Sequence, residues 1–215
     1  MSKFSWERFH AAPIVGIIRN VPLEPIQRIA ELYAAGGLTT LEITLNTPGA
    51  ADVIHQLKSS VGNDLNIGAG TVCSVEELDI ALNAGASFIV TPIINEEVIN
   101  KCVSNGIPIF PGAFTPSEIY KAWSLGAEMI KIFPATKLGA DYIREVLAPL
   151  NQVKLMPTGG VSFENCESFF KAGAVGVGMG SNLFPKDLIA AGDWDALAAI
   201  YKKYADMIRR IKAAA

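Results

Sequence analysis

The feature that most constrains the fold is an alternation of short apolar runs with segments of helical periodicity. Most helical segments end in a small residue and then glycine, immediately before the next apolar run. These joints are AAGG at 34–37, NAG at 83–85, SNG at 104–106, SLG at 124–126 and KAG at 171–173. Glycine readily adopts the left-handed conformation that ends a helix. The pattern therefore predicts an α/β fold built from repeated strand-helix units.

The apolar runs can supply eight strands: PIVGIIR (13–19), LTTLEITL (38–45), NIGAGTV (66–72), FIVTPII (88–94), IPIFPGA (107–113), EMIKIFPA (128–135), KLMPTGG (154–160) and VGVGMGS (175–181). A barrel of this kind typically has about 250 residues, and roughly 27 residues per unit suffice with short loops. We therefore expect a single (β/α)8 TIM barrel, closed by an amphipathic helix at 194–215. An open doubly wound sheet is the alternative, but no GxGxxG motif follows the first strand.

The composition fits one compact domain over residues 1–215, because 50% of the residues are hydrophobic and 18% are charged, without a shift along the chain. The formal net charge is −3, so no basic surface for nucleic acid is expected. The first residues, MSKFSWERFHAAP, lack the apolar core of a signal peptide, and no run approaches the roughly 18 apolar residues of a membrane span. We expect a cytoplasmic protein without a membrane partner.

Lys131 is an ionisable residue inside an apolar run, between Ile130 and Ile132. Alternation along a strand puts it on one face with Met129 and Phe133, and we expect that face to line the barrel interior. Burial disfavours the ammonium form, and a lowered pKa is what a lysine needs to form a Schiff base. We predict that Lys131 is a nucleophile. The alternative is a structural lysine that is paired with a buried acid.

Glu42 alternates with Thr40 and Thr44 and is therefore also expected to face inward. A carboxylate near an imine can take up and return protons, which is general acid/base catalysis. A salt bridge to Lys131 or Arg19 is equally compatible with this position.

Two further residues at predicted strand ends suit a keto acid. Arg19 ends the first run on the face of Val15 and Ile17, where a guanidinium could hold a carboxylate in bidentate geometry, although such arginines also serve as solvent-exposed anchors. Thr71 can add a hydroxyl, and the glycines beside it allow a ligand to approach the backbone.

Two glycine-rich turns follow the last two predicted strands: PTGGV at 157–161 and GMGSN at 178–182. Backbone N–H groups in such turns can surround a phosphate, and barrels commonly bind phosphate after the seventh and eighth strands. The residues predicted to bind it are Gly159, Gly160, Val161, Gly180 and Ser181. Tight turns in a small barrel would explain either motif alone, but not both at these two strand ends.

Together these motifs resemble the 2-keto-3-deoxy-6-phosphogluconate / 4-hydroxy-2-oxoglutarate class I aldolases, including their 6-phosphogalactonate relatives. The resemblance covers nearly the whole chain and rests on PIVGIIR, LEITLNTP, GAGTV, FIVTP, IPIFPGAFTPSE, IKIFPA, PTGGV and GMGSNL. It implies a Schiff base on Lys131, proton transfer by Glu42, pyruvyl binding by Arg19 and Thr71, and a pyruvate pocket walled by Pro92 and Phe133. It also implies a phosphorylated 2-keto-3-deoxy sugar acid as substrate, no cofactor and a homotrimer.

One position departs from the family pattern. Many phosphogluconate-cleaving members carry arginine where this chain has Asn46, and TLNTP is closer to the phosphogalactonate type. The resemblance therefore leaves the choice between the gluconate and galactonate epimers open.

Three other functions are alternatives to a Schiff-base aldolase. A barrel isomerase or epimerase, or a non-catalytic phosphosugar-binding protein, would share the phosphate turns but would not need an inward lysine beside a glutamate. A metal-dependent aldolase would need a ligand set. The chain has two histidines, His10 and His55, both outside the strand ends, and its cysteines lack metal-ligand spacing, so we expect no metal site.

Overall fold

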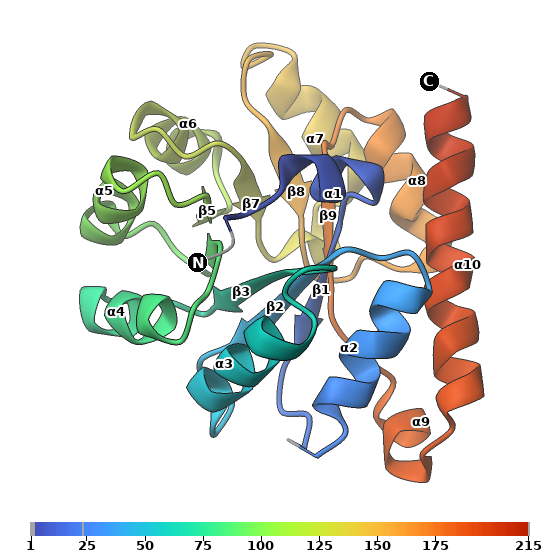
Figure 1. The fold of residues 1–215 in the computed structure, drawn as a ribbon. Coiled ribbons are helices and arrows are strands. Elements are labelled where there is room, and N and C mark those ends of the chain that lie inside the picture. The colour runs from blue at the N-terminus through green and yellow to red at the C-terminus, as the bar shows by residue number, and fades with distance from the viewer. Residues whose placement is uncertain (1–2, 23, 215) are drawn as a thin grey trace.

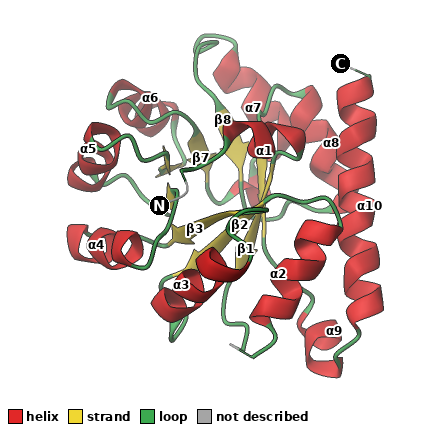
Figure 2. Ribbon diagram, in the orientation of Figure 1, coloured by secondary structure: helices red, strands yellow, loops and turns green. Residues whose placement is uncertain are grey.

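Parallel strands curl around the centre of the molecule and helices cover their outer face (Figures 1 and 2). The structure is a computed structural model, and it describes residues 3–22 and 24–214. The strands are β1 (Ile14–Ile18), β2 (Thr40–Thr44), β3 (Asn66–Gly70), β4 (Ile89–Val90), β5 (Ile109–Phe110), β6 (Gly112–Ala113), β7 (Ile130–Ile132), β8 (Leu155–Pro157) and β9 (Val177–Met179).

The helices are α1 (Trp6–Ala11), α2 (Ile26–Ala35), α3 (Ala50–Ser60), α4 (Val75–Asn83), α5 (Glu96–Ser104), α6 (Pro116–Ser124), α7 (Gly139–Leu147), α8 (Phe163–Lys171), α9 (Lys186–Ala191) and α10 (Trp194–Ala213), with a 3-10 turn at Ala135–Lys137. Helix α1 precedes the first strand, α2 to α8 connect successive strands, and α9 and α10 follow the last strand. Helix α10 confirms the closing helix predicted from the sequence, and it lies along α2, α8 and α9 (Figure 1). None of the helices in the described part of the chain is long and apolar enough to cross a membrane.

Within residues 3–22 and 24–214, the strands pair as two parallel sheets. Six strands follow the order β5-β4-β3-β2-β1-β9, and three follow the order β6-β7-β8. A bridge between Thr158 and Gly178 and a hydrogen bond of 3.0 Å from the Val175 N–H to the Leu155 carbonyl join the end of the second sheet to β9. These pairings establish a curled parallel sheet in an α/β fold.

The fifth predicted strand, at 107–113, is divided in the structure at Pro111. Residues before it pair with β4, and residues after it pair with β7. Proline has no N–H to donate to a ladder, so the chain changes its strand partner at this residue. The other predicted strands are present but shorter, since their last residues belong to the loops that form the site.

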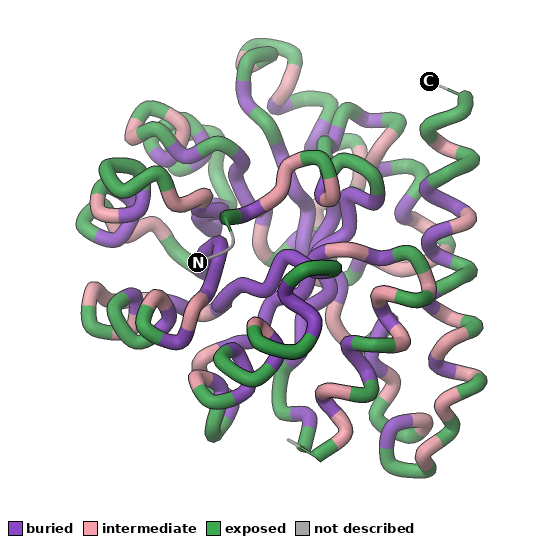
Figure 3. The backbone as a smooth tube through the Cα atoms, viewed as in Figure 1, coloured by how far each residue is buried: buried purple, intermediate pink, exposed green. Residues whose placement is uncertain are grey.

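Alternate residues of the strands point in opposite directions, as the sequence predicts. Ile130, Ile132, Leu41 and Ile43 belong to the large core between strands and helices. A second cluster fills the space that the strands enclose: Phe4, Phe9, Val15, Ile17, Phe88, Val90, Phe110, Met129 and Met156. The strands are accordingly buried along their whole length (Figure 3). Met129 lies in this inner cluster, which confirms the inward face assigned to Lys131.

The inner cluster closes the amino-terminal end of the strands. Phe9 belongs to α1, which precedes β1, and a Cβ on Gly176 before β9 would lie 2.7 Å from the Phe9 ring. Phe4 packs edge-on against Phe88 at 5.3 Å between ring centroids. The carboxyl ends of the strands are therefore the end at which a ligand can approach.

Helix starts and ends follow the predicted signals. Ser74, Asn95 and Thr115 accept hydrogen bonds from first-turn N–H groups, and Thr115 forms a capping box with Glu118. The glycines of the predicted joints have positive φ, at Gly37, Gly85, Gly106, Gly126 and Gly173. These signals fix where each loop leaves its helix, and so which residues reach the carboxyl ends.

Candidate active site at the carboxyl ends of the strands

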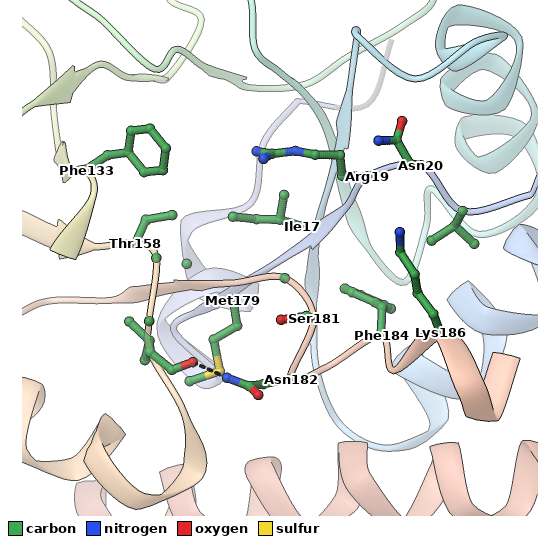
Figure 4. Close-up of a pocket in the computed structure, with 16 residues that line it drawn as sticks. Ile17, Arg19, Asn20, Phe133, Thr158, Met179, Ser181, Asn182, Phe184 and Lys186 are labelled. Carbon is green, nitrogen blue, oxygen red and sulfur yellow. Dashed lines mark hydrogen bonds between the residues drawn. The ribbon is translucent and has the colours of Figure 1, made fainter. Parts of the chain in front are cut away.

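A cavity of about 350 Å³ opens among the loops that follow β1, β7, β8 and β9 (Figure 4). The predicted site residues that line it are Arg19, Phe133, Gly159, Gly160, Val161, Gly180 and Ser181. The structure thus brings together residues that lie far apart in the sequence. Figure 4 shows the Arg19 side chain extending toward Phe133, with Ser181 and Asn182 below them in the view.

Lys131 and Glu42 are buried next to this cavity and do not line it. Lys131 is 2% exposed and Glu42 is 1% exposed. Lys131 Nζ lies 4.6 Å from the centroid of the Phe133 ring, which forms part of the wall. Glu42 on β2 pairs in register with Ile17 on β1, and Ile17 also lines the cavity. Both side chains therefore lie behind residues that line the cavity, Lys131 next to Phe133 and Glu42 next to Ile17.

The surroundings shift both groups toward their neutral forms. Burial lowers the pKa of the Lys131 ammonium, an effect that the Glu42 charge opposes and the Arg19 charge reinforces. Burial raises the pKa of the Glu42 carboxyl, against the effect of Lys131 and Arg19. An amine with a lowered pKa is available as a nucleophile, and a carboxyl with a raised pKa can both accept and donate a proton.

The Glu42 carboxylate has no hydrogen-bond partner among the described residues. Both of its oxygens are buried and neither forms a hydrogen bond there. Buried polar atoms normally form hydrogen bonds, so an unsatisfied carboxylate needs an explanation, and use by a ligand, a water or a reaction provides one. This argues against the structural ion pair as the whole explanation of Glu42.

Hydrogen bonds between loops hold the end of β1. Asn20 has a positive φ of 52°, and its N–H donates to Thr47 Oγ1 at 3.1 Å. Thr47 Oγ1 lies 3.1 Å from Thr44 Oγ1, which donates to the Ile18 carbonyl at 3.3 Å. The loops after β1 and β2 are thereby tied together, which fixes the backbone that carries Arg19.

The two glycine turns are also tied to each other. Asn182 Nδ2 donates to the Val161 carbonyl at 2.7 Å, and Asn165 Nδ2 donates to the Gly160 carbonyl at 2.9 Å. Gly159 and Gly160 have φ values of 90° and 74°, which other residues rarely adopt. The turns thus present backbone without intervening side chains, which suits an anion.

Two predicted residues, Thr71 and Pro92, follow β3 and β4 and are not among the residues that line the cavity. Thr71 has a φ of 58°, an unusual conformation for a β-branched residue. Asn46 also lies apart, in a separate surface hollow with Glu77 and Ile80.

Sequence reasoning missed several lining residues: Ile17, Asn20, Val21, Thr158, Gly178, Met179, Asn182, Phe184 and Lys186. Strand-end position could have singled out Asn20 and Thr158. Lys186 begins α9, and a lysine at the start of a helix is ordinarily expected to be a solvated surface charge, so the sequence did not indicate it.

The curled parallel sheet, with a buried lysine beside a buried glutamate, suits a lyase that works through an imine. The family model for KDPG and KHG aldolase matches residues 6–200 of the chain. The chain belongs to this aldolase family, and its enzyme class is that of the lyases. The isomerase or epimerase and the non-catalytic binding protein therefore do not describe it.

Individual relatives agree. The chain is 34% identical over 195 residues to the 2-dehydro-3-deoxy-phosphogluconate aldolase of Treponema pallidum, covering 90% of this chain and 91% of the relative. It is 33% identical over 199 residues to the 2-dehydro-3-deoxy-6-phosphogalactonate aldolase of Escherichia coli, covering 92% and 97%. Both substrate epimers are thus represented at nearly equal identity.

Solved structures agree in fold. A native KDPGal structure superposes with a TM-score of 0.88 at 29% identity, covering 99% of this chain and 100% of that chain. The KDPG aldolase of Legionella pneumophila, captured with pyruvate as a covalent carbinolamine, gives a TM-score of 0.84 at 30% identity, covering 91% and 95%.

Proposed function

We propose that this chain is a class I aldolase that cleaves 2-dehydro-3-deoxy-6-phosphogluconate or its galactonate epimer to pyruvate and glyceraldehyde 3-phosphate. The proposal rests above all on one observation: Lys131 and Glu42 are buried together, and both Glu42 oxygens lack partners among the described residues. The names of the relatives support this substrate class.

In the proposed reaction, the neutral amine of Lys131 attacks the C2 ketone to give a carbinolamine, and loss of water gives an imine. Glu42 supplies and takes up the protons of these steps. Removal of the C4 hydroxyl proton then breaks the C3–C4 bond, and the electron pair moves into the protonated imine to form an enamine. Protonation at C3 and hydrolysis release pyruvate and restore Lys131.

The other predicted residues would bind the substrate. Arg19 at the mouth would hold the carboxylate, Thr71 would donate or accept at the pyruvyl part, and Pro92 and Phe133 would form its apolar wall. The turns at 157–161 and 178–182 would bind phosphate through Gly159, Gly160, Val161, Gly180 and Ser181. No group of three or more His, Cys, Asp or Glu suitable for a metal occurs within residues 3–22 and 24–214.

Covalent trapping tests the central claim. Borohydride reduction in the presence of pyruvate, followed by peptide mass mapping, should add a pyruvyl-derived mass to Lys131 and abolish turnover. Lys131→Ala should lose the adduct and the activity, whereas Lys121→Ala, at an exposed position on α6, should keep both. An adduct on another lysine would reject the assignment. Assay of both epimers with the same preparation identifies the preferred substrate.

Three structural expectations join this proposal. The first two are that the bridge at Thr158 and Gly178 completes a closed (β/α)8 barrel and that residues 1–215 fold as one domain.

The third is a homotrimer, supported by exposed apolar side chains on or beside α4, α5 and α6: Ile80, Ile93, Phe114 and Tyr120. Sedimentation equilibrium should give three times the 22.9 kDa chain mass. Tyr120→Glu should lower the measured mass, because a charge would replace an exposed apolar side chain of the proposed interface.

A further inference from the structure

The charge of the cavity is one-sided. Its lining residues include two cations, Arg19 and Lys186, and no aspartate or glutamate. A cavity lined by one sign of charge attracts ligands of the opposite sign. Arg19 suits one anionic group of a ligand, which leaves Lys186 for a second.

The backbone that leads to Lys186 is fixed relative to the second glycine turn, at 178–182. The N–H groups of Leu183 and Phe184 donate to the Gly180 carbonyl at 2.9 and 3.1 Å. Phe184 is 3% exposed, and its ring stacks at 6.0 Å from that of Tyr33. Two residues later the chain reaches Lys186, so a fixed turn connects this lysine to Gly180.

The Lys186 ammonium is available to a ligand. The side chain is exposed, and it forms no ion pair or hydrogen bond with the residues that the structure describes. Figure 4 shows it extending from the start of α9, beside Phe184, toward Asn20. By contrast, Lys101 and Lys121 form ion pairs with Asp79 and Glu96.

We propose that Lys186 binds the phosphate of the substrate and thereby selects phosphorylated over phosphate-free keto acids. This rests on the proposed function. The glycine turns supply neutral N–H donors, and Lys186 adds a flexible point charge that can follow a phosphate dianion. Arg19 holds the carboxylate at the other end of the same ligand. Lys186 is thus a specificity-determining residue that takes no part in the bond-breaking step.

Lys186→Met removes the charge and keeps the length of the side chain. We expect kcat/KM for the phosphorylated substrate to fall by about three- to tenfold, mainly through KM, because the lysine is exposed. Turnover of 4-hydroxy-2-oxoglutarate, which has no phosphate, should stay at the wild-type value. Lys186→Arg should restore most of the loss. Lys202→Met, an exposed lysine of α10 away from the cavity, is the matched control. Equal losses for both substrates, or no loss for either, would overturn the assignment.

Binding of inorganic phosphate separates this inference from the proposed function. Isothermal titration at low ionic strength should show weaker phosphate binding by Lys186→Met than by wild type, and the difference should shrink as salt is added. This measurement requires no turnover. If wild type cleaves neither epimer, the aldolase proposal fails while the titration still tests Lys186. If both proteins bind phosphate equally, the Lys186 proposal fails even where cleavage is observed.

Discussion

The Glu42 carboxylate occupies the space that a side chain at Gly70 would need. A Cβ built on Gly70 would lie 1.7 Å from Glu42 Oε1 and 2.4 Å from Cδ. The two residues lie diagonally across neighbouring strands: Gly70, at the end of β3, pairs in register with Thr44, two residues along β2 from Glu42. Glycine at this position is therefore a condition for the observed placement of the carboxylate.

Gly70→Ala should displace Glu42 without touching Lys131. We expect kcat to fall by about 10² because Glu42, the proposed proton shuttle, leaves its position. We also expect the pH optimum to move to lower pH, because the Glu42 charge, which raises the pKa of Lys131, moves away. Steady-state kinetics across pH measures both, with circular dichroism to confirm the fold. A folded Gly70→Ala protein with wild-type kcat and pH profile would show that the placement of Glu42 is unimportant.

The pKa of Lys131 should respond in opposite directions to its two charged neighbours. The Glu42 charge raises this pKa, so Glu42→Gln should lower it further and extend amine reactivity to lower pH. The Arg19 charge lowers it, so Arg19→Gln should raise it and confine reactivity to higher pH. The rate of Lys131 carbamoylation by cyanate, followed by mass mapping against pH, measures both. Shifts of the same sign would mean that direct charge interactions do not control this amine.

Gly180 offers a strain-free test of the phosphate turns. Its φ is not positive, and an added Cβ would lie 3.7 Å from the Ile17 carbonyl oxygen, an ordinary contact. Gly160 differs, because a Cβ there would lie 2.8 Å from Thr136 Cα at a φ of 74°. We expect Gly180→Ala to fold normally and to lose kcat/KM selectively for the phosphorylated substrate, since a methyl group would enter the cavity. An unchanged ratio between phosphorylated and phosphate-free substrates would place the phosphate elsewhere.

Two buried tyrosines should respond oppositely to loss of the hydroxyl. Tyr33 Oη donates to the Thr40 carbonyl at 3.1 Å, whereas Tyr201 Oη is buried without a partner in the described part of the chain. Their rings are 5.1 Å apart, so each variant controls for the other. Tyr33→Phe should lower the free energy of unfolding by about 1 kcal/mol, and Tyr201→Phe should leave it unchanged or raise it. Urea unfolding measures both, and a loss at Tyr201 equal to that at Tyr33 would reveal a hydrogen bond there.

Residues within one strand were predictable because the alternation of side chains is a local property. Met129 and Ile130 were enough to orient Lys131 inward, and Leu41 and Ile43 did the same for Glu42. The repeated glycine joints likewise gave the order of strands and helices. These predictions depended on a few neighbouring residues each.

Contacts between strands were not predictable in this way. The fit of Gly70 against Glu42 depends on the register of β2 with β3, and Lys186 reaches the cavity through a turn whose path the sequence does not specify. Pro111 was visible in the sequence, but the change of pairing partner there depends on where β4 and β7 lie. Asn46, the position that departs from the family pattern, lies in a different hollow.

The aromatic cluster of Phe4, Phe9 and Phe88 fills the amino-terminal end of the curled sheet, so among the described residues the carboxyl end is the side left open to a ligand. If Lys131 forms the imine, as proposed, the substrate enters with its pyruvyl end first, and the phosphorylated fragment then lies between the imine and the open end. After cleavage, the aldehyde product must depart before pyruvate. In the synthetic direction the same geometry would require pyruvate to bind first, so the packed amino-terminal end would impose a compulsory order on a reaction whose chemistry alone does not require one.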